Sequence, residues 1–168
     1  MTAALVSSPL KVRQRKHRIW AEDPSGAVVL DGTTSQYPDA YVCNGPGGTW
    51  RIAGLIKEAT PPYRTVLDPA GRDVARIEKT SRKHWELRLA GGGSATVSSH
   101  SLFMRGYTCT IGDLAHAATP ALAPQRYFTL TFTETALGRP DRDAIAVAAT
   151  WICESWLASM ISDAGGGD

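Results

Sequence analysis

A chain of 168 residues is long enough for one domain with a buried core. Apolar residues make up 43% and charged residues 20%, proportions that exclude wholesale disorder. Eighteen basic and sixteen acidic side chains leave a net charge of +2, which is too small to predict nucleic acid as a partner. An electrostatic function must therefore depend on where the charges lie.

The N-terminal segment bears on where the protein acts. Residues 1–9 are expected to be flexible, and they lack the basic start and sustained apolar stretch of a signal peptide. No run in the sequence approaches the roughly 20 apolar residues that a membrane-spanning helix needs. We therefore expect a cytoplasmic protein without a transmembrane segment.

Two turns of the same chemistry predict two β-hairpins. Residues 23–26 (Asp-Pro-Ser-Gly) and 68–71 (Asp-Pro-Ala-Gly) each lie between short β-prone runs. Proline at the second position fixes φ near the value of a type I turn, and glycine at the fourth accepts a positive φ. Residues 31–48, between the hairpins, are predicted to form a loop.

Further strands follow from alternation and β-propensity. In residues 85–89, Trp-Glu-Leu-Arg-Leu, apolar and charged side chains alternate as in a half-buried antiparallel strand. An Ala- and Pro-rich loop is expected at 114–124. Nine to eleven short strands in all favour a barrel or a sandwich. The other predicted strands after the first hairpin are 50–56, 64–67, 74–77, 95–97, 102–104, 107–111 and 127–132.

The C-terminal region predicts a helix over about 141–162. Asp141 and Asp143 suit a helix start, where free N–H groups and the helix dipole favour negative side chains. No charged residue occurs from Ala144 to Cys153, so the helix is apolar nearly all round and is expected to be enclosed by protein. The glycine-rich residues 163–168 are expected to form a disordered tail. The domain itself is predicted to span residues 10–162.

The tryptophans are expected to belong to the core. Trp20, Trp50 and Trp85 each lie in or beside a predicted strand and are expected to pack inward with their N–H groups bonded. Trp151 and Trp156 are expected to be core residues of the helix.

The sequence predicts no catalytic residues, metal site or cofactor. Three cysteines lie far apart without ligand spacing, which predicts buried, reduced thiols. Residues 98–101, Ser-Ser-His-Ser, lack a Gly-x-Ser-x-Gly elbow and are expected to form a polar turn. The glycines at 91–93 precede no Lys-Ser/Thr pair and predict a plain turn.

The densest cluster of charge lies near the N-terminus. Within residues 11–18 the cations are Lys11, Arg13, Arg15, Lys16 and Arg18. On a strand the first three share one face, and the last two share the other. Such a cluster is typical of contact with anionic lipid headgroups, or of a solvated edge strand that charge keeps from aggregating. A second group after the second hairpin would extend it if the fold brings the two together: Lys79, Arg82 and Lys83.

The order of these features resembles the tubby-like superfamily, close to its LURP-one-related and scramblase-like branch. The matching features are a basic strand at 11–19, hairpins at 23–26 and 67–77, and the helix opening at 143–148. The resemblance covers most of residues 10–162. It implies a mainly β (α+β) fold, in which a closed antiparallel barrel of twelve strands surrounds a hydrophobic C-terminal helix.

From these observations we expect a non-enzymatic binding module. Its basic N-terminal strand would contact anionic phospholipid, which places a cytoplasmic protein peripherally at a membrane surface. One alternative is a regulatory domain that binds a protein partner. Another is a lipocalin-like small-ligand carrier, because Gly48-Thr49-Trp50 matches the Gly-x-Trp that opens the first strand of such barrels.

Overall fold

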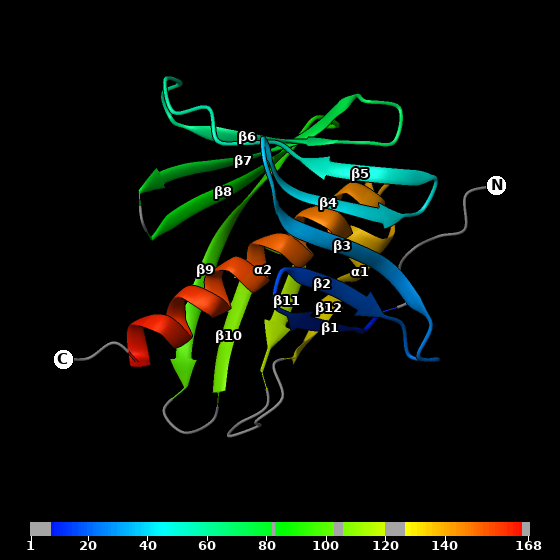
Figure 1. The fold of residues 1–168 in the computed structure, drawn as a ribbon, viewed down its shortest axis with the longest axis vertical. Helices are drawn as coiled ribbons and strands as arrows, with labels where there is room; N and C mark the ends of the chain where they lie inside the picture. Colours follow the sequence, from blue (N-terminus) through cyan, green and yellow to red (C-terminus); the bar gives the residue numbers. More distant parts are fainter. Residues whose placement is uncertain (1–7, 82, 103–105, 120–126, 166–168) are drawn as a thin grey trace.

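A computed structural model describes residues 8–81, 83–102, 106–119 and 127–165. Within these ranges the chain forms twelve strands and two helices (Figure 1). The strands are β1 (Leu10–Arg15), β2 (Arg18–Glu22), β3 (Val28–Gln36), β4 (Asp39–Gly45), β5 (Gly48–Ile52), β6 (Tyr63–Leu67), β7 (Asp73–Ser81), β8 (His84–Leu89), β9 (Ser94–Leu102), β10 (Gly106–Ile111), β11 (Ala115–Ala118) and β12 (Tyr127–Phe132). The helices are α1 (Glu134–Leu137) and α2 (Arg142–Gly165).

The strands form a closed antiparallel barrel. Each strand pairs with its neighbours in the chain, and β1 pairs with β12 to close the ring. Closure removes the exposed edges that would otherwise pair with other chains. The predicted fold class is confirmed at this level: the protein is mainly β, and its described part contains twelve strands rather than nine to eleven.

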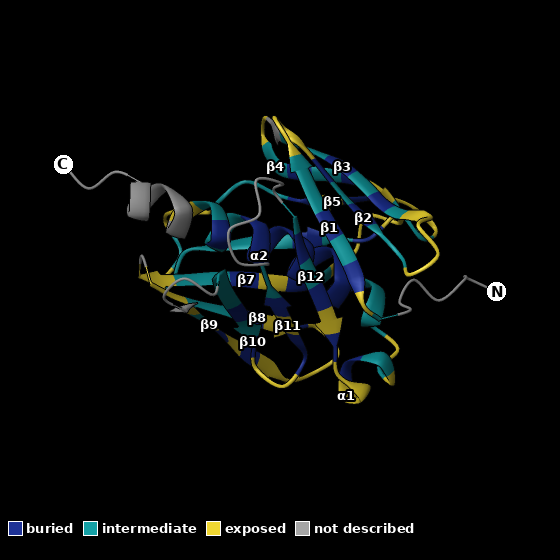
Figure 2. Cartoon of the chain, turned by 90° about the horizontal axis from the view of Figure 1, so that it is seen from below, coloured by how far each residue is buried: buried dark blue, intermediate teal, exposed yellow. Residues whose placement is uncertain are grey.

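Side chains alternate between the barrel wall's two faces. On β8, Leu87 and Leu89 are buried while Arg88 between them is exposed, as the alternation predicts. Figure 2 shows the same change between buried and exposed positions along the strands, with exposed residues concentrated in the turns. The inward side chains of all twelve strands contribute to one apolar core.

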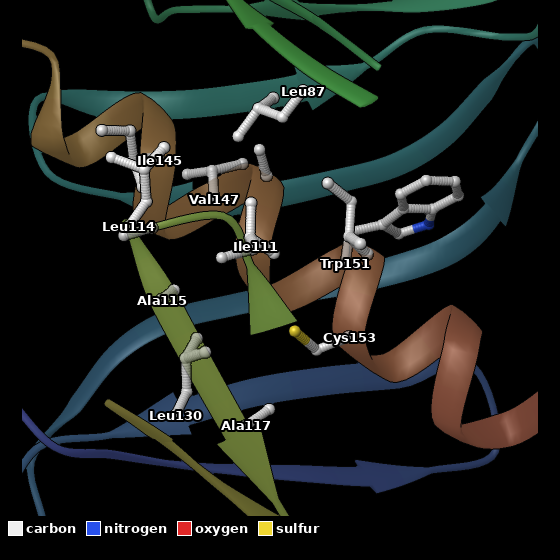
Figure 3. Packing of buried hydrophobic residues seen from close by; sticks show 14 of the residues in the cluster. Leu87, Ile111, Leu114, Ala115, Ala117, Leu130, Ile145, Val147, Trp151 and Cys153 are labelled. Carbon is white, nitrogen blue, oxygen red and sulfur yellow. The ribbon is translucent and has the colours of Figure 1, made fainter. Parts of the chain in front are cut away.

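Helix α2 occupies the interior of this barrel. Every residue from Ala144 to Cys153 is buried, and successive helical residues are about 100° apart, so all faces of this part of the helix pack against protein. Figure 3 shows Ile145 and Val147 of α2 among wall residues that include Ile111 and Leu130. The prediction of an enclosed apolar helix is confirmed. Alanines along this segment leave room for the surrounding strands.

The start of α2 is fixed to one end of the barrel. Thr133 caps α1, its hydroxyl accepting a hydrogen bond from the Ala136 N–H at 3.2 Å. Arg139 pairs with Asp141 at 2.8 Å and donates to the carbonyl of Gly92 at 2.8 Å, which links the helix entrance to the β8–β9 turn. The helix begins at Arg142 and ends at Gly165, rather than covering about 141–162.

Residues 31–48 are not a loop, contrary to the prediction. β3 continues to Gln36, and β4 and β5 form a hairpin across Pro46 and Gly47. Glycine is needed at position 32 because the neighbouring strand lies so close: a Cβ there would lie 2.5 Å from the Cβ of Cys43. The bulky partner at this contact is Tyr41, whose hydroxyl donates to the Ile19 carbonyl at 3.0 Å.

Three other segments also differ from the predictions. The strand expected at 50–56 ends at Ile52, because the chain then leaves the sheet and regains only a single bridge, between Ile56 and Tyr63. Residues 98–101 belong to β9 instead of a turn. β11 lies inside the expected loop at 114–124, where Ala115 and Ala117 pack inward. The rest of that loop after 119, and most of the strand expected at 102–104, lie outside the described residues.

Alternating strand direction gives the barrel two distinct ends. Connections that follow even-numbered strands lie at the end where α1 lies and α2 begins, which we call the entry end. Connections that follow odd-numbered strands lie at the opposite end, from which the C-terminal part of α2 emerges (Figure 1). We call this the exit end.

Both predicted hairpin turns form, at the entry end. Gly26 and Gly71 have φ of 87° and 80°, as the turn chemistry requires. In the second turn Asp68 accepts hydrogen bonds from the N–H groups of Ala70 and Arg72 at 3.0 and 2.9 Å, and from Arg72 Nε at 2.9 Å. Burial raises the pKa of Asp68, but these donors outweigh it and hold the pKa below its usual value.

Replacing Ala148 by leucine tests the packing of α2. Ala148 is fully buried inside the barrel, so the larger side chain must displace the wall and should lower the free energy of unfolding by about 1–3 kcal/mol. Urea unfolding measures this loss. Ala158→Leu is the matched control, since Ala158 lies on the same helix but is only half-buried. Equal stability of the two variants would contradict an enclosed helix.

Asp68→Ala should lower the free energy of unfolding by about 2 kcal/mol at pH 7, because hydrogen bonds to a charged acceptor are lost. The folded pKa lies below the unfolded value of about 3.9, so ionised Asp68 stabilises the fold above that pH. This contribution disappears as the pH falls through the folded pKa. Unfolding curves from pH 7 to 2.5 should therefore converge for wild type and variant, whereas Asp73→Ala, at an exposed site, should change little.

Candidate functional site

The basic N-terminal segment forms β1, a turn and the start of β2. Lys11, Arg13 and Arg15 share the outward face of β1, as predicted, because Leu10 and Val12 point inward. The prediction that Lys16 and Arg18 share the opposite face is wrong. The chain reverses at Lys16 and His17, and Arg18 becomes the cross-strand partner of Arg15, so it joins the same outward face.

Three of these five cations already have partners on the barrel wall. Arg13 Nε lies 3.2 Å from Glu22 Oε1, and Lys11 Nζ lies 4.3 Å from the centre of the Tyr127 ring. Arg18 makes a bidentate pair with Asp31 at 2.8 and 2.9 Å. The hydrogen bond from Arg18 lowers the pKa of the Asp31 carboxyl.

Arg15 and Lys16 are therefore the available cations of this segment. Both are exposed, and neither has an acidic partner in the described part of the chain. Trp20 does not pack inward as predicted, because Ile19 and Ala21 take the inward positions of β2. Its indole N–H instead donates to Glu22 at 3.1 Å.

The second basic group lies at the same end of the barrel but across from the first. The β1–β2 and β7–β8 turns both lie at the exit end, with four strands between them on either side. Lys83 is exposed in the β7–β8 turn, while Lys79 shares the inward face of β7 with Ile77. Arg82 lies outside the described residues. The sequence-predicted site residues thus flank the emerging helix from opposite walls.

The described connections at the two ends differ in charge. Those at the exit end carry Lys16, Lys57 and Lys83 against Glu58 alone. Those at the entry end carry five carboxylates and only two arginines. The entry-end residues are Asp23, Asp68, Arg72, Asp113, Glu134, Arg139 and Asp141.

The exit end also presents exposed apolar side chains. Tyr37, in the β3–β4 turn, is 97% exposed, and Ile56, in the β5–β6 connection, is 40% exposed. The third large apolar residue that is exposed in the described structure, Val28, lies near the entry end. The exit end therefore combines cations with apolar side chains.

Among the cavities of the described structure, we compare one at each end of the barrel. The larger one, of 770 Å³ at the entry end, is bordered by the Asp68–Arg72 and Arg139–Asp141 ion pairs, so its nearest cations are already neutralised. The smaller one, of 140 Å³, lies beside α2 toward the exit end, and we call it the tryptophan pocket. It is lined by Leu55, Arg64, Ile77, Lys79, Trp85, Trp151 and Ser155.

The filled interior bears on the lipocalin-like alternative. Lipocalin-like barrels hold their ligand inside, whereas here residues 144–153 of α2 lie buried in the interior. The Gly48-Thr49-Trp50 motif opens β5 rather than a first strand, and Trp50 donates its N–H to the Pro46 carbonyl at 2.9 Å. The described structure therefore has a helix at the place where a lipocalin-like carrier would hold its ligand.

Nucleophilic and metal chemistry have little support in the described structure. Cys43, Cys109 and Cys153 are free and buried, as predicted. Burial raises the pKa of Cys43 to about 12, and a hydrogen bond with Cys109, followed by burial, raises that of Cys153. Within the described ranges no three His, Cys, Asp or Glu residues gather to hold a metal ion.

The histidines are dispersed over the outside of the barrel. His100 and His116 lie exposed on β9 and β11, and neither is paired with a carboxylate among the described residues. His84 Nδ1 lies 2.8 Å from Ser81 Oγ, a pair that the sequence analysis missed. No described carboxylate orients this histidine, so the pair is not a catalytic triad.

Comparisons with family models, curated proteins and solved structures find no match for this chain. The tubby-like resemblance therefore stays a prediction beyond the closed barrel and its helix. In the described part of the chain, no helix has both the length and the apolar character needed to cross a bilayer.

Thiol titration tests the burial of the cysteines. At pH 8 the native protein should leave all three thiols unreacted toward a disulfide reagent, because they are buried and at least two have raised pKa values. Unfolding in guanidinium should release all three. A native thiol that reacts as fast as free glutathione would contradict the burial.

Proposed function

We propose that this chain is a non-enzymatic, tubby-like binding module that contacts anionic phospholipid membranes with the exit end of its barrel. The observation that carries the proposal is the difference in charge between the two ends. Lys16, Lys57 and Lys83 lie in the exit-end turns, whereas carboxylates predominate at the entry end. An anionic surface would attract the first end and repel the second.

The exposed apolar residues strengthen this proposal. Tyr37 and Ile56 extend from the same end as the three lysines. Aromatic side chains with a polar tip suit the boundary between headgroups and hydrocarbon, and cations beside them can contact phosphate. A protein bound in this way lies peripherally on the membrane, as expected for a cytoplasmic protein at the anionic inner leaflet.

The structure reduces the number of residues in the basic N-terminal strand that are available to contact a membrane. Arg13 and Arg18 hold Glu22 and Asp31 on the barrel wall, so their replacement would disturb local packing as well as charge. Arg15 and Lys16 are the members of the strand that remain available to a membrane.

Vesicle co-sedimentation tests the proposal with the triple variant Lys16→Gln, Lys57→Gln, Lys83→Gln. Each lysine near an anionic surface contributes roughly 1 kcal/mol, so affinity for phosphatidylserine vesicles should fall by about two orders of magnitude. Wild-type binding should weaken as salt rises from low to physiological concentration, and neutral vesicles should not bind.

A matched control distinguishes a contact made by the exit end from an effect of the protein's net charge alone. The triple variant Ala27→Glu, Ala70→Glu, Ser94→Glu lowers the net charge of +2 by the same amount, but at the exposed entry end. It should keep its vesicle affinity within about threefold. Equal losses in the two variants, or no wild-type binding at either salt concentration, would refute the proposal. A salt-resistant protein partner in place of vesicle binding would favour the regulatory alternative.

A further inference from the structure

The tryptophan pocket brings together groups from the barrel wall and from α2. Arg64 on β6 points inward with Val66, and Lys79 on β7 points inward with Ile77. Arg64 Cζ lies 5.3 Å from the centre of the Trp151 ring. On the neighbouring strand β7, Lys79 Nζ lies 5.6 Å from the centre of the ring of Trp85, its cross-strand partner on β8.

The aromatic rings join the two sides of the pocket. Trp85 stacks on Trp151 with ring centres 5.7 Å apart, and it meets Trp156 edge-on at 5.8 Å. Trp85 and Trp151 therefore form an apolar wall between the strand and the helix. Trp85 and both cations are only half-buried, so the wall can be reached from solvent.

The pocket holds hydrogen-bond donors that lack acceptors. The Trp85 Nε1 atom is buried without a hydrogen-bond partner, and the Ser155 hydroxyl has none in the described structure. Arg64 uses one of its N–H groups in a long, 3.4 Å hydrogen bond to the Ala53 carbonyl. An acceptor bound in the pocket would receive a hydrogen bond from the Ser155 hydroxyl.

The pocket also holds two cations without a counter-ion. No carboxylate lines it, and neither Arg64 nor Lys79 pairs with an acid in the described part of the chain. Burial alone lowers the pKa of Arg64, which agrees with the lack of a nearby carboxylate. Removing cations from water without an opposite charge is costly, and an anion in the pocket would offset that cost.

We propose that the tryptophan pocket binds a phosphate monoester. A phosphate monoester carries a charge of about −1.5 to −2 and three terminal acceptor oxygens, which match the two cations and the Ser155 hydroxyl. Its ester carbon would lie against the Trp85–Trp151 wall. At 140 Å³ the pocket is smaller than the roughly 300–1,000 Å³ of drug-sized sites, so it holds the phosphate and only the adjoining carbons.

This phosphate has two possible sources. The pocket lies toward the exit end, where the headgroup of phosphatidic acid would present a phosphate monoester to a protein bound by the proposed membrane contact. A free phosphate monoester in solution presents the same group. The pocket residues are separate from Lys16, Lys57 and Lys83, so the two proposals fail independently.

Binding of glycerol phosphate at constant ionic strength tests the pocket, measured by tryptophan fluorescence and by calorimetry. Saturable, one-to-one binding is expected. Lys79→Met keeps an unbranched side chain on Trp85 but removes the charge, and it should weaken binding at least tenfold. Ser155→Ala, which removes only a hydroxyl, should weaken it about threefold or more. Arg76→Met is the matched control for charge, because Arg76 lies on the same strand as Lys79 but faces outward, and it should leave the affinity unchanged.

A second arm uses vesicles that contain either phosphatidic acid or phosphatidylserine at equal surface charge. Binding of glycerol phosphate identifies a soluble ligand, while Lys79-dependent preference for phosphatidic acid alone identifies the lipid headgroup; both results support the pocket. Equal losses in Lys79→Met and Arg76→Met would overturn it, as would the absence of both glycerol phosphate binding and a Lys79-dependent lipid preference. Glycerol phosphate binding that survives in the lysine-to-glutamine triple variant would sustain the pocket even if the membrane proposal fails.

Discussion

A closed barrel of twelve strands encloses more space than its own inward side chains can fill, and α2 occupies that space. Barrels of about eight strands are already just wide enough to be filled by side chains, so a wider ring needs a ligand, water or further chain inside. Here residues 144–153 supply the filling, and the alanines among them let the strands approach the helix backbone. The apolar surface of the helix and that of the wall thus remove each other from water.

Because α2 lies in the interior, the candidate binding surfaces are the ends of the barrel and its outer wall. Cations on the wall are largely held by neighbours, as Arg18 is by Asp31, which leaves the exit-end turns as the accessible positive charge. Where α2 emerges, its tryptophans meet Trp85 on β8, and an inward arginine and lysine lie on these rings without a carboxylate. The helix therefore both completes the core and, at its emerging end, forms one side of the candidate binding pocket.

Much of the fold could be predicted from local chemistry. The strand at 127–132, the two Asp-Pro-x-Gly turns and the buried stretch of α2 all depend on short-range patterns that the structure retains. The loop prediction for 31–48 was wrong because a glycine required by a tertiary contact, such as Gly32, is indistinguishable in sequence from a turn glycine. The pocket was missed because inward orientation of Arg64 depends on strand register, and its contact with Trp151 joins residues far apart in the chain.

Native-state hydrogen exchange of the α2 amides tests the central claim most directly. If residues 144–153 fill the barrel, their amides can exchange only when the barrel opens, and their exchange free energies should equal those of the most protected amides in β4, β7 and β10. Both sets should then match the global free energy of unfolding and fall together in denaturant. Exchange of these helix amides at a free energy several kcal/mol below that of the strands would show that the helix leaves while the barrel persists, and would contradict the account.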